Sequence, residues 1–410
     1  MVIKILHINY NDDSGGAAIA VQRIHEAQKI VGINSRILVA EKFSNDKDII
    51  GPNSTLEEIK WKIFKSFNRK IERLQKIKRY DSNSFNILPN NFIKKLNKVD
   101  CDIINLHWIG NNLISIKSLS KIKKPIVWTL HDMWAYTGSE HYTQTKRFIE
   151  GYEKSNKPKD LKGFDIEKYC WELKKKYYPK QMLIIPTSKW QFENTKKSYL
   201  LKNQETRKIT LPLDFDFWKP FNKKLARELL NIPHDKKVLL IGSQNLGHIR
   251  KGFYLIDKIF QNIKNKNIMI LSFGSNNNSL KNMSSTKNIS LKEIKPNTSD
   301  LKIAYSASDL FIAPSIQESF GQTVLEAASC CLPSICFENN GFSEIIDHKI
   351  NGYLAKENDL IDYSKGIDWC LENIKREQME INISKLKDKF SYQKIGNEYK
   401  SIYEKLLAIN

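Results

Sequence analysis

Two glutamates separated by seven residues, Glu318 and Glu326, are the most specific chemical signal in the sequence. If a helix begins near Gly321, Glu318 lies in the loop above a strand. Glu326 then lies about a turn and a half into the helix, near its positive end. Ionised carboxylates only accept hydrogen bonds, and the bonds are strong, so this pair can hold the hydroxyl groups of one ligand. The alternative is structural, with Glu318 at a helix start and Glu326 on the surface.

A basic pair, Arg250 and Lys251, follows a short apolar run at residues 237–242 and precedes a helical pattern. The pair therefore lies at the carboxyl end of a predicted strand, where open α/β sheets bind ligands. Two cations in that place can hold a diphosphate, although they can also be part of a generally basic surface. The start of the helix that carries Glu326 offers further phosphate-binding N–H groups, at Gly321, Gln322 and Thr323.

Two glycines, Gly15 and Gly16, open a helix just after the first predicted strand. Glycine lets backbone N–H groups approach an anion, and the helix dipole favours negative charge at that end. A tight strand-to-helix turn explains the same residues, so this pair alone does not establish a phosphate site.

Short buried strands are predicted to position these candidate residues. Each of nine runs is rich in Ile, Leu and Val and alternates with a helical pattern, which is typical of parallel strands covered on both faces. The runs are residues 2–8, 35–39, 101–106, 125–130, 182–186, 237–242, 267–273, 310–313 and 333–337. The alternation restarts after Leu213, and residues 212–220, bracketed by prolines, are predicted to connect two doubly wound α/β domains around a cleft. We expect the domains to span residues 1–213 and 214–389.

Residues 56–79 predict a basic amphipathic helix in which lysines and arginines crowd around one apolar stripe. The stripe comprises Leu56, Ile59, Ile63, Phe67, Ile71, Leu74 and Ile77. Such a helix can lie in the interface of an anionic membrane. A helix that packs its stripe on its own domain and leaves the basic face in solvent is the simpler explanation.

The chain of 410 residues is strongly basic, with 66 Lys and Arg against 45 Asp and Glu and a formal net charge of +21. This excess favours a polyanionic partner, such as nucleic acid, an anionic membrane or a phosphate-rich substrate, unless it is only a lysine-rich background. Because the basic residues are spread and form no recognition motif, we predict no nucleic-acid partner.

The six cysteines lack disulfide-framework spacing, so we expect small buried residues in a reducing compartment. The N-terminus is too polar for a signal peptide, and no apolar run approaches the roughly 18–20 residues of a membrane span. We therefore expect a cytoplasmic protein, which can be peripheral at the inner face of the cytoplasmic membrane.

Together the motifs resemble the retaining group 1 glycosyltransferases of family 4, which have the GT-B fold of two Rossmann-like domains facing a central cleft. The resemblance extends over essentially the whole chain, and residues 105–109 and 130–138 resemble the colanic-acid and exopolysaccharide subgroup. The segments that carry it are the two glutamates within residues 318–327, Lys251 with Gly252, the 212–220 connection as a hinge, and the motifs at residues 340–346 and 351–354.

The resemblance implies a donor site for a nucleotide-diphosphate sugar such as a UDP- or GDP-sugar. Lys251, assisted by Arg250, would neutralise the diphosphate, while Glu326 would bind the ribose hydroxyls and Glu318 those of the sugar. His131 would lie where donor and acceptor meet, unless it is a buried structural histidine. The other implied donor-binding positions are Gly15, Gly16, Ser243, Phe320, Gly321, Gln322 and Thr323. The last helix, residues 390–410, would pack back on the N-terminal domain.

The implied reaction is hexosyl transfer with retention to a glycan or lipid-linked acceptor, in the biosynthesis of exopolysaccharide, capsule, O-antigen or lipopolysaccharide. Neither a metal nor another cofactor is expected, because basic residues and helix N-termini would stabilise the leaving diphosphate. The sequence departs from the family at Ser243, where many members carry arginine, and at Asn340-Gly341, where Gly-Gly is usual. The alternative is a non-catalytic sugar-nucleotide-binding protein or regulatory subunit, which would be expected to lose Lys251 or one of the two glutamates.

Overall fold

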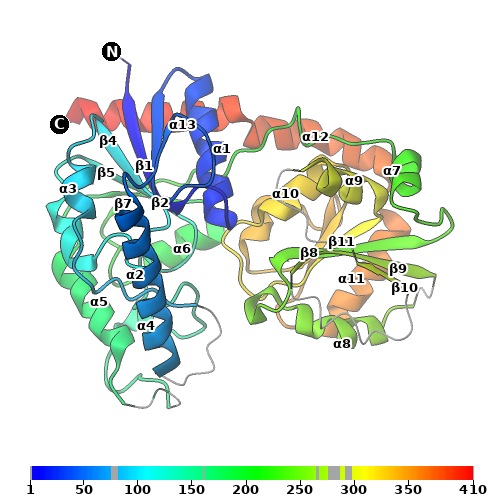
Figure 1. Cartoon of the computed structure of the whole chain (residues 1–410). Coiled ribbons are helices and arrows are strands. Elements are labelled where there is room, and N and C mark those ends of the chain that lie inside the picture. The colour runs from blue at the N-terminus through cyan, green and yellow to red at the C-terminus, as the bar shows by residue number, and fades with distance from the viewer. Residues whose placement is uncertain are drawn as a thin grey trace. The chain divides into compact units, whose positions relative to one another are not determined.

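The computed structural model describes residues 2–74, 82–159, 161, 163–264, 267–275, 287–290 and 298–409. The chain forms two compact units (Figure 1). Unit 1 comprises Met1–Pro212 with Tyr392–Asn410, and unit 2 comprises Leu213–Ser391. The chain thus passes from one unit to the other within the 212–220 connection and again at Ser391, so the last helix belongs to unit 1.

Unit 1 is built on a parallel sheet of seven strands in the order β3-β2-β1-β4-β5-β6-β7. Because β1 lies between β2 and β4, the strand order reverses there, which makes this place the topological switch point of the sheet. All five strands predicted for this part of the chain are present. The strands are β1 (Lys4–Asn11), β2 (Asn34–Glu41), β3 (Ile49–Ile50), β4 (Ile103–Leu106), β5 (Ile126–Leu130), β6 (Leu183–Pro186) and β7 (Glu205–Thr206).

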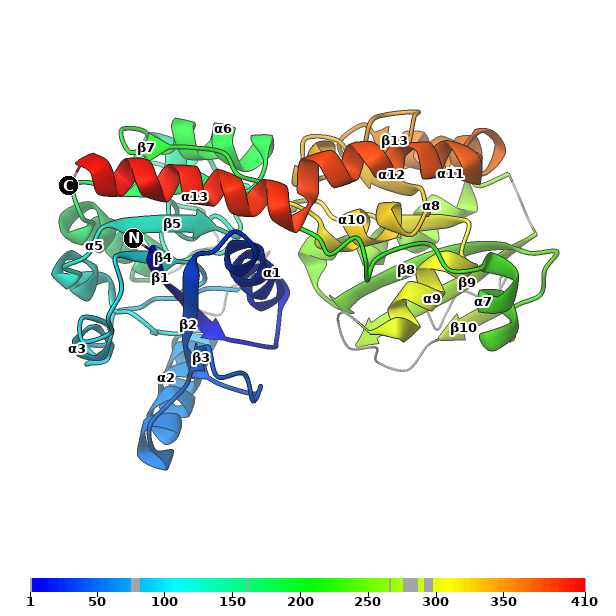
Figure 2. The same ribbon diagram turned by 90° about the horizontal axis from the view of Figure 1, so that it is seen from above.

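Helices cover both faces of this sheet. On one face α1 (Gly16–Ile30) packs against α13 (Tyr392–Ile409), which Figure 2 shows running across the unit. A Cβ atom on Gly396 of α13 would lie 2.2 Å from the carbonyl oxygen of Ala27, so glycine permits this close approach. The main core lies on the other face, under α2 (Thr55–Leu74), α3 (Phe92–Leu96) and α5 (Ile166–Tyr177). The remaining helices of the unit are η1 (Ile116–Lys121), α4 (Arg147–Glu150) and α6 (Lys189–Lys197).

Unit 2 has a parallel sheet of six strands in the order β10-β9-β8-β11-β12-β13, with its switch point between β8 and β11. The strands are β8 (Lys237–Asn245), β9 (Ile268–Ser275), β10 (Lys287–Ser290), β11 (Leu310–Ala313), β12 (Ser334–Phe337) and β13 (Gly352–Ala355). A core cluster packs α8 (Ile256–Gln261) and α11 (Leu360–Asn373) on one face. Among the described residues of this unit, the other helices are α7 (Lys223–Leu229), η2 (Ile249–Lys251), η3 (Phe253–Leu255), α9 (Ser299–Ala307), α10 (Gln322–Ser329), η5 (Gly341–Glu344) and α12 (Arg376–Phe390).

The helix predicted at residues 56–79 is present as α2 up to Leu74, and residues 75–79 lie outside the described residues. The expectation that its apolar stripe packs on its own domain is wrong for most of the stripe. Leu56 and Ile63 are 79% and 59% exposed, whereas Trp61 is 1% exposed and enters the core. The helix is anchored through the face that carries Trp61 and Asn68, because the large indole buries more apolar surface than any residue of the stripe. The exposed stripe is therefore left without a partner among the described residues.

Three smaller features complete the description of the fold. Asp214 accepts hydrogen bonds from the backbone N–H groups of Asp216 (2.9 Å) and Phe217 (3.1 Å), so the Asp-Phe-Asp sequence closes a turn. All six cysteines are free and buried. Within the described residues, no helix has the length and hydropathy that crossing a membrane requires.

Candidate functional site

Three predicted site residues of unit 2 meet at the switch point of its sheet. Arg250 and Lys251 lie in η2, the first helix after β8, and Glu318 lies in the loop between β11 and α10. Lys251 Nζ is 2.5 Å from Glu318 Oε2, and Arg250 Nη1 is 3.3 Å from the same oxygen. The sequence indicated separate roles for the basic pair and for Glu318, whereas the structure joins them in one ion cluster. Two cations share one carboxylate, so the cluster has a net positive charge.

The two basic side chains also set the protonation state of Glu318. Burial by itself raises the pKa of this carboxyl, but Lys251 and Arg250 outweigh burial, and the resulting pKa lies below its usual value. Glu318 is therefore ionised at neutral pH. In that state it accepts hydrogen bonds and has no proton to donate, so it is suited to holding hydroxyl groups and unsuited to acting as a general acid.

The loop that carries Glu318 is held by Asn340, a residue for which the sequence analysis predicts no role. Asn340 Nδ2 donates to the carbonyl oxygens of Ser315 (3.0 Å) and Ile316 (3.3 Å), and its Oδ1 accepts from the backbone N–H of Glu318 at 2.6 Å. A Cβ atom on Gly341 would lie 2.2 Å from a backbone carbonyl oxygen of this loop. The Asn-Gly pair that departs from the family pattern thus positions the carboxylate. Its position along the chain does not indicate this contact.

The helix start next to the ion cluster has the backbone geometry that the sequence predicts. Gly321 is the N-cap of α10 with φ = 99°, and a Cβ atom there would lie 2.4 Å from the ring of Phe342. The first turn, which includes Gln322 and Thr323, contains no acidic residue. Phe320, expected at the donor site, is buried, and its ring packs edge-to-face on Phe390 at 5.8 Å.

The second glutamate, Glu326, is buried within α10, so the surface alternative for it is wrong. Its Oε2 accepts a hydrogen bond from the hydroxyl of Tyr305 on α9 at 3.2 Å, a partner that the sequence did not indicate. Ser243 lies in β8 with a buried hydroxyl that has no hydrogen-bond partner among the described residues. Because Ser243 carries no charge, the positive charge near the carboxyl end of β8 comes from Arg250 and Lys251.

In unit 1 the predicted residues lie at the carboxyl ends of β1 and β5. Gly15 is the N-cap of α1 with φ = 94°, a conformation that favours glycine, and the first turn of this helix contains no acidic residue. Gly16 is the first residue of α1, and His131 directly follows β5. Because the carboxyl ends of parallel strands lie at one edge of the sheet, the glycine turn and the histidine share that edge.

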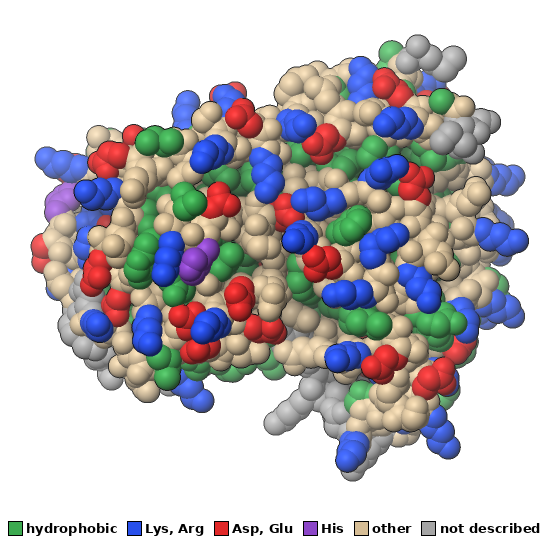
Figure 3. Space-filling view, turned by 180° about the vertical axis from the view of Figure 1, so that it is seen from behind, with side chains coloured by type: hydrophobic (Ala, Val, Ile, Leu, Met, Phe, Trp, Pro, Cys, Tyr) green, Lys and Arg blue, Asp and Glu red, His purple; other side chains and the backbone are tan. Residues whose placement is uncertain are grey.

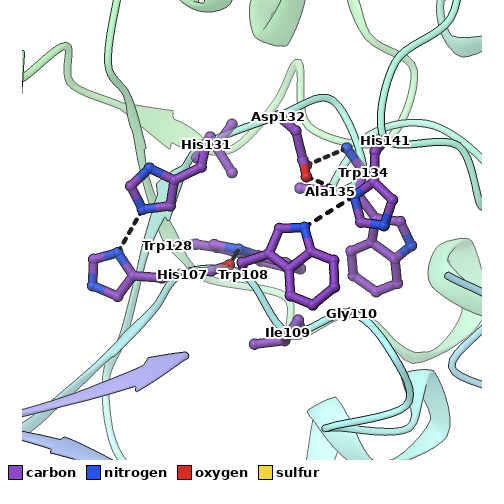
Figure 4. Close-up of a pocket in the computed structure, with 11 residues that line it drawn as sticks. His107, Trp108, Ile109, Gly110, Trp128, His131, Asp132, Trp134, Ala135 and His141 are labelled. Carbon is purple, nitrogen blue, oxygen red and sulfur yellow. Dashed lines mark hydrogen bonds and ion pairs between the residues drawn. The ribbon is translucent and has the colours of Figure 1, made fainter. Parts of the chain in front are cut away.

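A small pocket at this edge contains His131 and a cluster of aromatic and polar side chains (Figure 4). His131 Nε2 lies 2.9 Å from Nδ1 of His107. On the other side of the pocket, His141 Nδ1 lies 2.6 Å from Asp132 Oδ2, and the indole of Trp108 stacks on the His141 ring. No role is predicted for His141 from the sequence, yet it orients Asp132 next to His131, and only the fold reveals this contact.

The protonation state of His131 follows from its surroundings. Burial lowers the pKa of this imidazole to about 4, although the neighbouring Asp132 acts in the opposite direction. His131 is therefore neutral at physiological pH. A neutral imidazole offers one N–H donor and one lone pair, so His131 can accept a hydrogen bond without carrying a charge.

Comparisons with known proteins show what the chain is similar to. Residues 222–386 match the family model of the glycosyl transferases group 1. An uncharacterized glycosyltransferase of Haemophilus influenzae is 29% identical over 168 residues, which are 38% of this chain and 47% of that protein. The match therefore spans about half the length of that curated relative.

Two solved structures cover nearly the whole chain. Sucrose-phosphate synthase from Thermosynechococcus elongatus has a TM-score of 0.69 and 16% identity, with 100% of each chain covered. HepE from Anabaena, solved in complex with UDP and glucose, has a TM-score of 0.63 and 14% identity, with 98% of this chain and 100% of HepE covered. The predicted fold class is thus confirmed: the chain has the α/β fold with two parallel sheets of the GT-B glycosyltransferase structures, and its residues 222–386 carry the sequence pattern of the glycosyl transferases group 1.

Proposed function

We propose that the protein is a retaining glycosyltransferase of family 4 that transfers a hexosyl group from a nucleotide-diphosphate sugar to a hydroxyl of a glycan or lipid-linked acceptor. The observation that carries this proposal is the ion cluster of Arg250, Lys251 and Glu318 at the switch point of unit 2. The cluster supplies two cations for a diphosphate and an ionised carboxylate for sugar hydroxyls. The matches to glycosyl transferases group 1 and the likeness to HepE with UDP and glucose support the same assignment.

The chemistry follows from these charges. As the bond between the anomeric carbon and the diphosphate oxygen breaks, negative charge grows on the diphosphate, and Lys251 and Arg250 stabilise it. The N–H groups at the start of α10 add to this stabilisation. Glu318 holds hydroxyls of the sugar, and Glu326 accepts hydrogen bonds from the ribose. The acceptor oxygen bonds to the anomeric carbon on the face that the diphosphate leaves, a diphosphate oxygen takes the acceptor proton, and the configuration is retained.

Donor binding is the direct test. We expect it to need no metal, because Arg250 and Lys251 supply the positive charge that a metal ion would otherwise supply. A panel of UDP-, GDP- and dTDP-sugars should contain at least one that raises Tm in the presence of EDTA. At 100 times Kd the stabilisation is about 2.7 kcal/mol, which corresponds to roughly 5–10 °C for a unit of this size. The matching nucleoside monophosphate, which lacks the second phosphate, is the control and should shift Tm far less. A panel without any shift, or a shift that appears only when Mg²⁺ or Mn²⁺ is added, would contradict the proposal.

We further propose that the acceptor belongs to bacterial surface polysaccharide biosynthesis and that the protein is peripheral at the inner face of the cytoplasmic membrane. The membrane location is supported by the exposed stripe of α2, defined by Leu56, Ile59, Ile63 and Phe67. Exposed basic side chains flank it on the same helix, at Lys62, Arg69, Lys70 and Arg73. Figure 3 shows another face of the molecule, where basic side chains are interspersed with acidic ones. An apolar stripe beside a basic strip is complementary to an anionic lipid surface.

Vesicle binding tests the membrane proposal. Vesicles with anionic phosphatidylglycerol should bind the full chain, and binding should weaken as salt is raised. Replacing both Ile59 and Ile63 with serine should reduce binding at least about tenfold, because each isoleucine buries an apolar side chain in the interface. Ile381→Ser is the control, since Ile381 is 72% exposed on α12 of the other unit. Equal binding of the two variants, or equal binding to neutral vesicles, would contradict the assignment.

A further inference from the structure

Three histidines of unit 1 form a continuous row of hydrogen bonds from the pocket into the core. His131 Nε2 lies 2.9 Å from His107 Nδ1, and His107 Nε2 lies 2.8 Å from His7 Nδ1. Figure 4 shows the outer pair. His7 is on β1, while His107 and His131 directly follow β4 and β5, so the row crosses neighbouring strands of the sheet. We refer to His131, His107 and His7 as the histidine chain.

The inner end of the histidine chain is fixed by Gln28 of α1. Its Oε1 lies 2.9 Å from His7 Nε2, and its amide nitrogen donates to the hydroxyl of Tyr403 of α13 at 2.9 Å. The same hydroxyl accepts a second hydrogen bond, from Asn105 Nδ2 at 3.0 Å. A carboxamide has one donor end and one acceptor end, so when its nitrogen faces Tyr403 its oxygen faces His7. His7 must then carry its proton on Nε2.

One proton position determines the others. A neutral imidazole has one N–H and one lone pair, so His7 with Nε2–H presents the lone pair of Nδ1 to His107. His107 must donate from Nε2, which leaves its own Nδ1 to accept from His131. His131 is therefore protonated on Nε2, and its Nδ1 is the acceptor. The amide of Gln28 thus sets the tautomers of three rings.

The rings are neutral, as this alternation requires. Burial is the main cause that lowers the pKa of His7 to about 3 and that of His131 to about 4. Burial also lowers the pKa of His107 well below its usual value, and its two ring neighbours act in the same direction. A second proton on His7 or His107 would place an N–H against an N–H and break a hydrogen bond, whereas a second proton on His131 would occupy Nδ1 and remove the free acceptor.

We propose that Gln28, His7 and His107 are positioning residues that hold His131 as its Nε2–H tautomer, so that Nδ1 of His131 accepts a hydrogen bond from a hydroxyl group of the sugar substrate. Nδ1 has no hydrogen-bond partner in the described part of the chain, and it lies at the edge of the sheet where α/β folds bind ligands. That the ligand is a sugar rests on the proposed function, whereas the tautomer itself does not.

Nitrogen NMR of the full chain labelled with ¹⁵N-histidine tests the tautomer without any substrate. His131 is assigned by comparison with His131→Asn, and its Nε2 should be protonated while its Nδ1 shows the shift of an unprotonated ring nitrogen. In Gln28→Leu the amide acceptor is lost, and His131 should become a mixture of both tautomers. A wild-type His131 protonated on Nδ1, or an unchanged spectrum in Gln28→Leu, would overturn the proposal.

The matched control is Tyr399→Phe on α13. Thr129 Oγ1 lies 3.1 Å from the Tyr399 hydroxyl, so this variant removes one buried hydrogen bond between α13 and the sheet without touching the histidine chain. Tyr399→Phe should leave the tautomer unchanged. In a transfer assay Gln28→Leu should lower kcat/KM about tenfold relative to Tyr399→Phe, the effect of one hydrogen bond. If Gln28→Leu alters the tautomer of His131 but transfers as fast as Tyr399→Phe, the substrate contact is refuted. A wild type without transfer to any acceptor would refute the proposed function and leave the NMR result standing.

Discussion

Replacing Lys251 with alanine is expected to lower kcat for sugar transfer at least about 100-fold, because a preorganised charge on the leaving diphosphate is lost. Lys251 Nζ lies 2.5 Å from Glu318, and Arg250 remains on the same carboxylate after the substitution. The loop is still held by Asn340, so the fold and its Tm should change little. Steady-state kinetics with the donor identified by the thermal-shift panel, together with circular dichroism, measure both effects.

The control for this variant is Lys258→Ala. Lys258 is an exposed lysine on α8 of the same unit, so its removal changes the net charge equally and leaves the ion cluster untouched. Lys258→Ala should keep near-wild-type turnover. If Lys251→Ala also retains more than a third of wild-type kcat, stabilisation of the leaving diphosphate does not depend on the ion cluster, and the donor assignment fails.

Replacing Glu326 with glutamine is expected to weaken binding of the donor nucleotide about 10- to 100-fold, the usual effect of losing a charged hydrogen-bond acceptor. The substitution keeps the size of the side chain, which matters because Glu326 is only 4% exposed. Tyr305→Phe is the control: it removes the hydroxyl that donates to Glu326 and leaves the carboxylate in place. Its affinity for the nucleotide should stay within about threefold of wild type.

A comparison of nucleotides locates the contact on the ribose. Calorimetry with a nucleoside diphosphate and its 2′,3′-dideoxy analogue should show a large loss of affinity for the analogue in the wild-type protein. Glu326→Gln should already bind the nucleoside diphosphate weakly, so the dideoxy analogue should bind this variant with nearly the same affinity as the nucleoside diphosphate. An analogue that loses as much affinity in the variant as in the wild type would show that Glu326 does not bind the ribose hydroxyls.

The strands of both sheets could be predicted because their signal is local. A parallel strand covered on both faces is a short continuous apolar run, and each of the nine predicted runs coincides with a strand of the structure. Four strands were missed: β3, β7, β10 and β13. The first two contain only two residues each, too few to form a recognisable run. The strand order, and with it the two switch points, comes from pairing between segments far apart in the chain.

The helix α2 shows where periodicity stops being informative. The period identifies a helix, but α2 has two faces with large apolar residues, and the sequence alone does not say which face meets the sheet. The structure buries Trp61 and leaves Ile63 exposed, because the indole fills the core between the strands and α3. The sequence left two alternatives for the stripe, packing on its own domain or facing an anionic membrane, and the burial of Trp61 leaves most of the stripe exposed.

The sequence by itself determined which residue types stand at the ends of the strands: a basic pair after β8, a glutamate after β11, a histidine after β5 and glycines where helices begin. Residue type and turn position are local properties, so one strand and its loop are enough to reveal them. Only the tertiary structure decided that Lys251 meets Glu318 across 67 residues and that His7 meets His107 across 100. Burial and hydrogen bonding then set which of these groups carry charge, because both depend on neighbours that the folded sheet brings together and that the linear chain keeps apart.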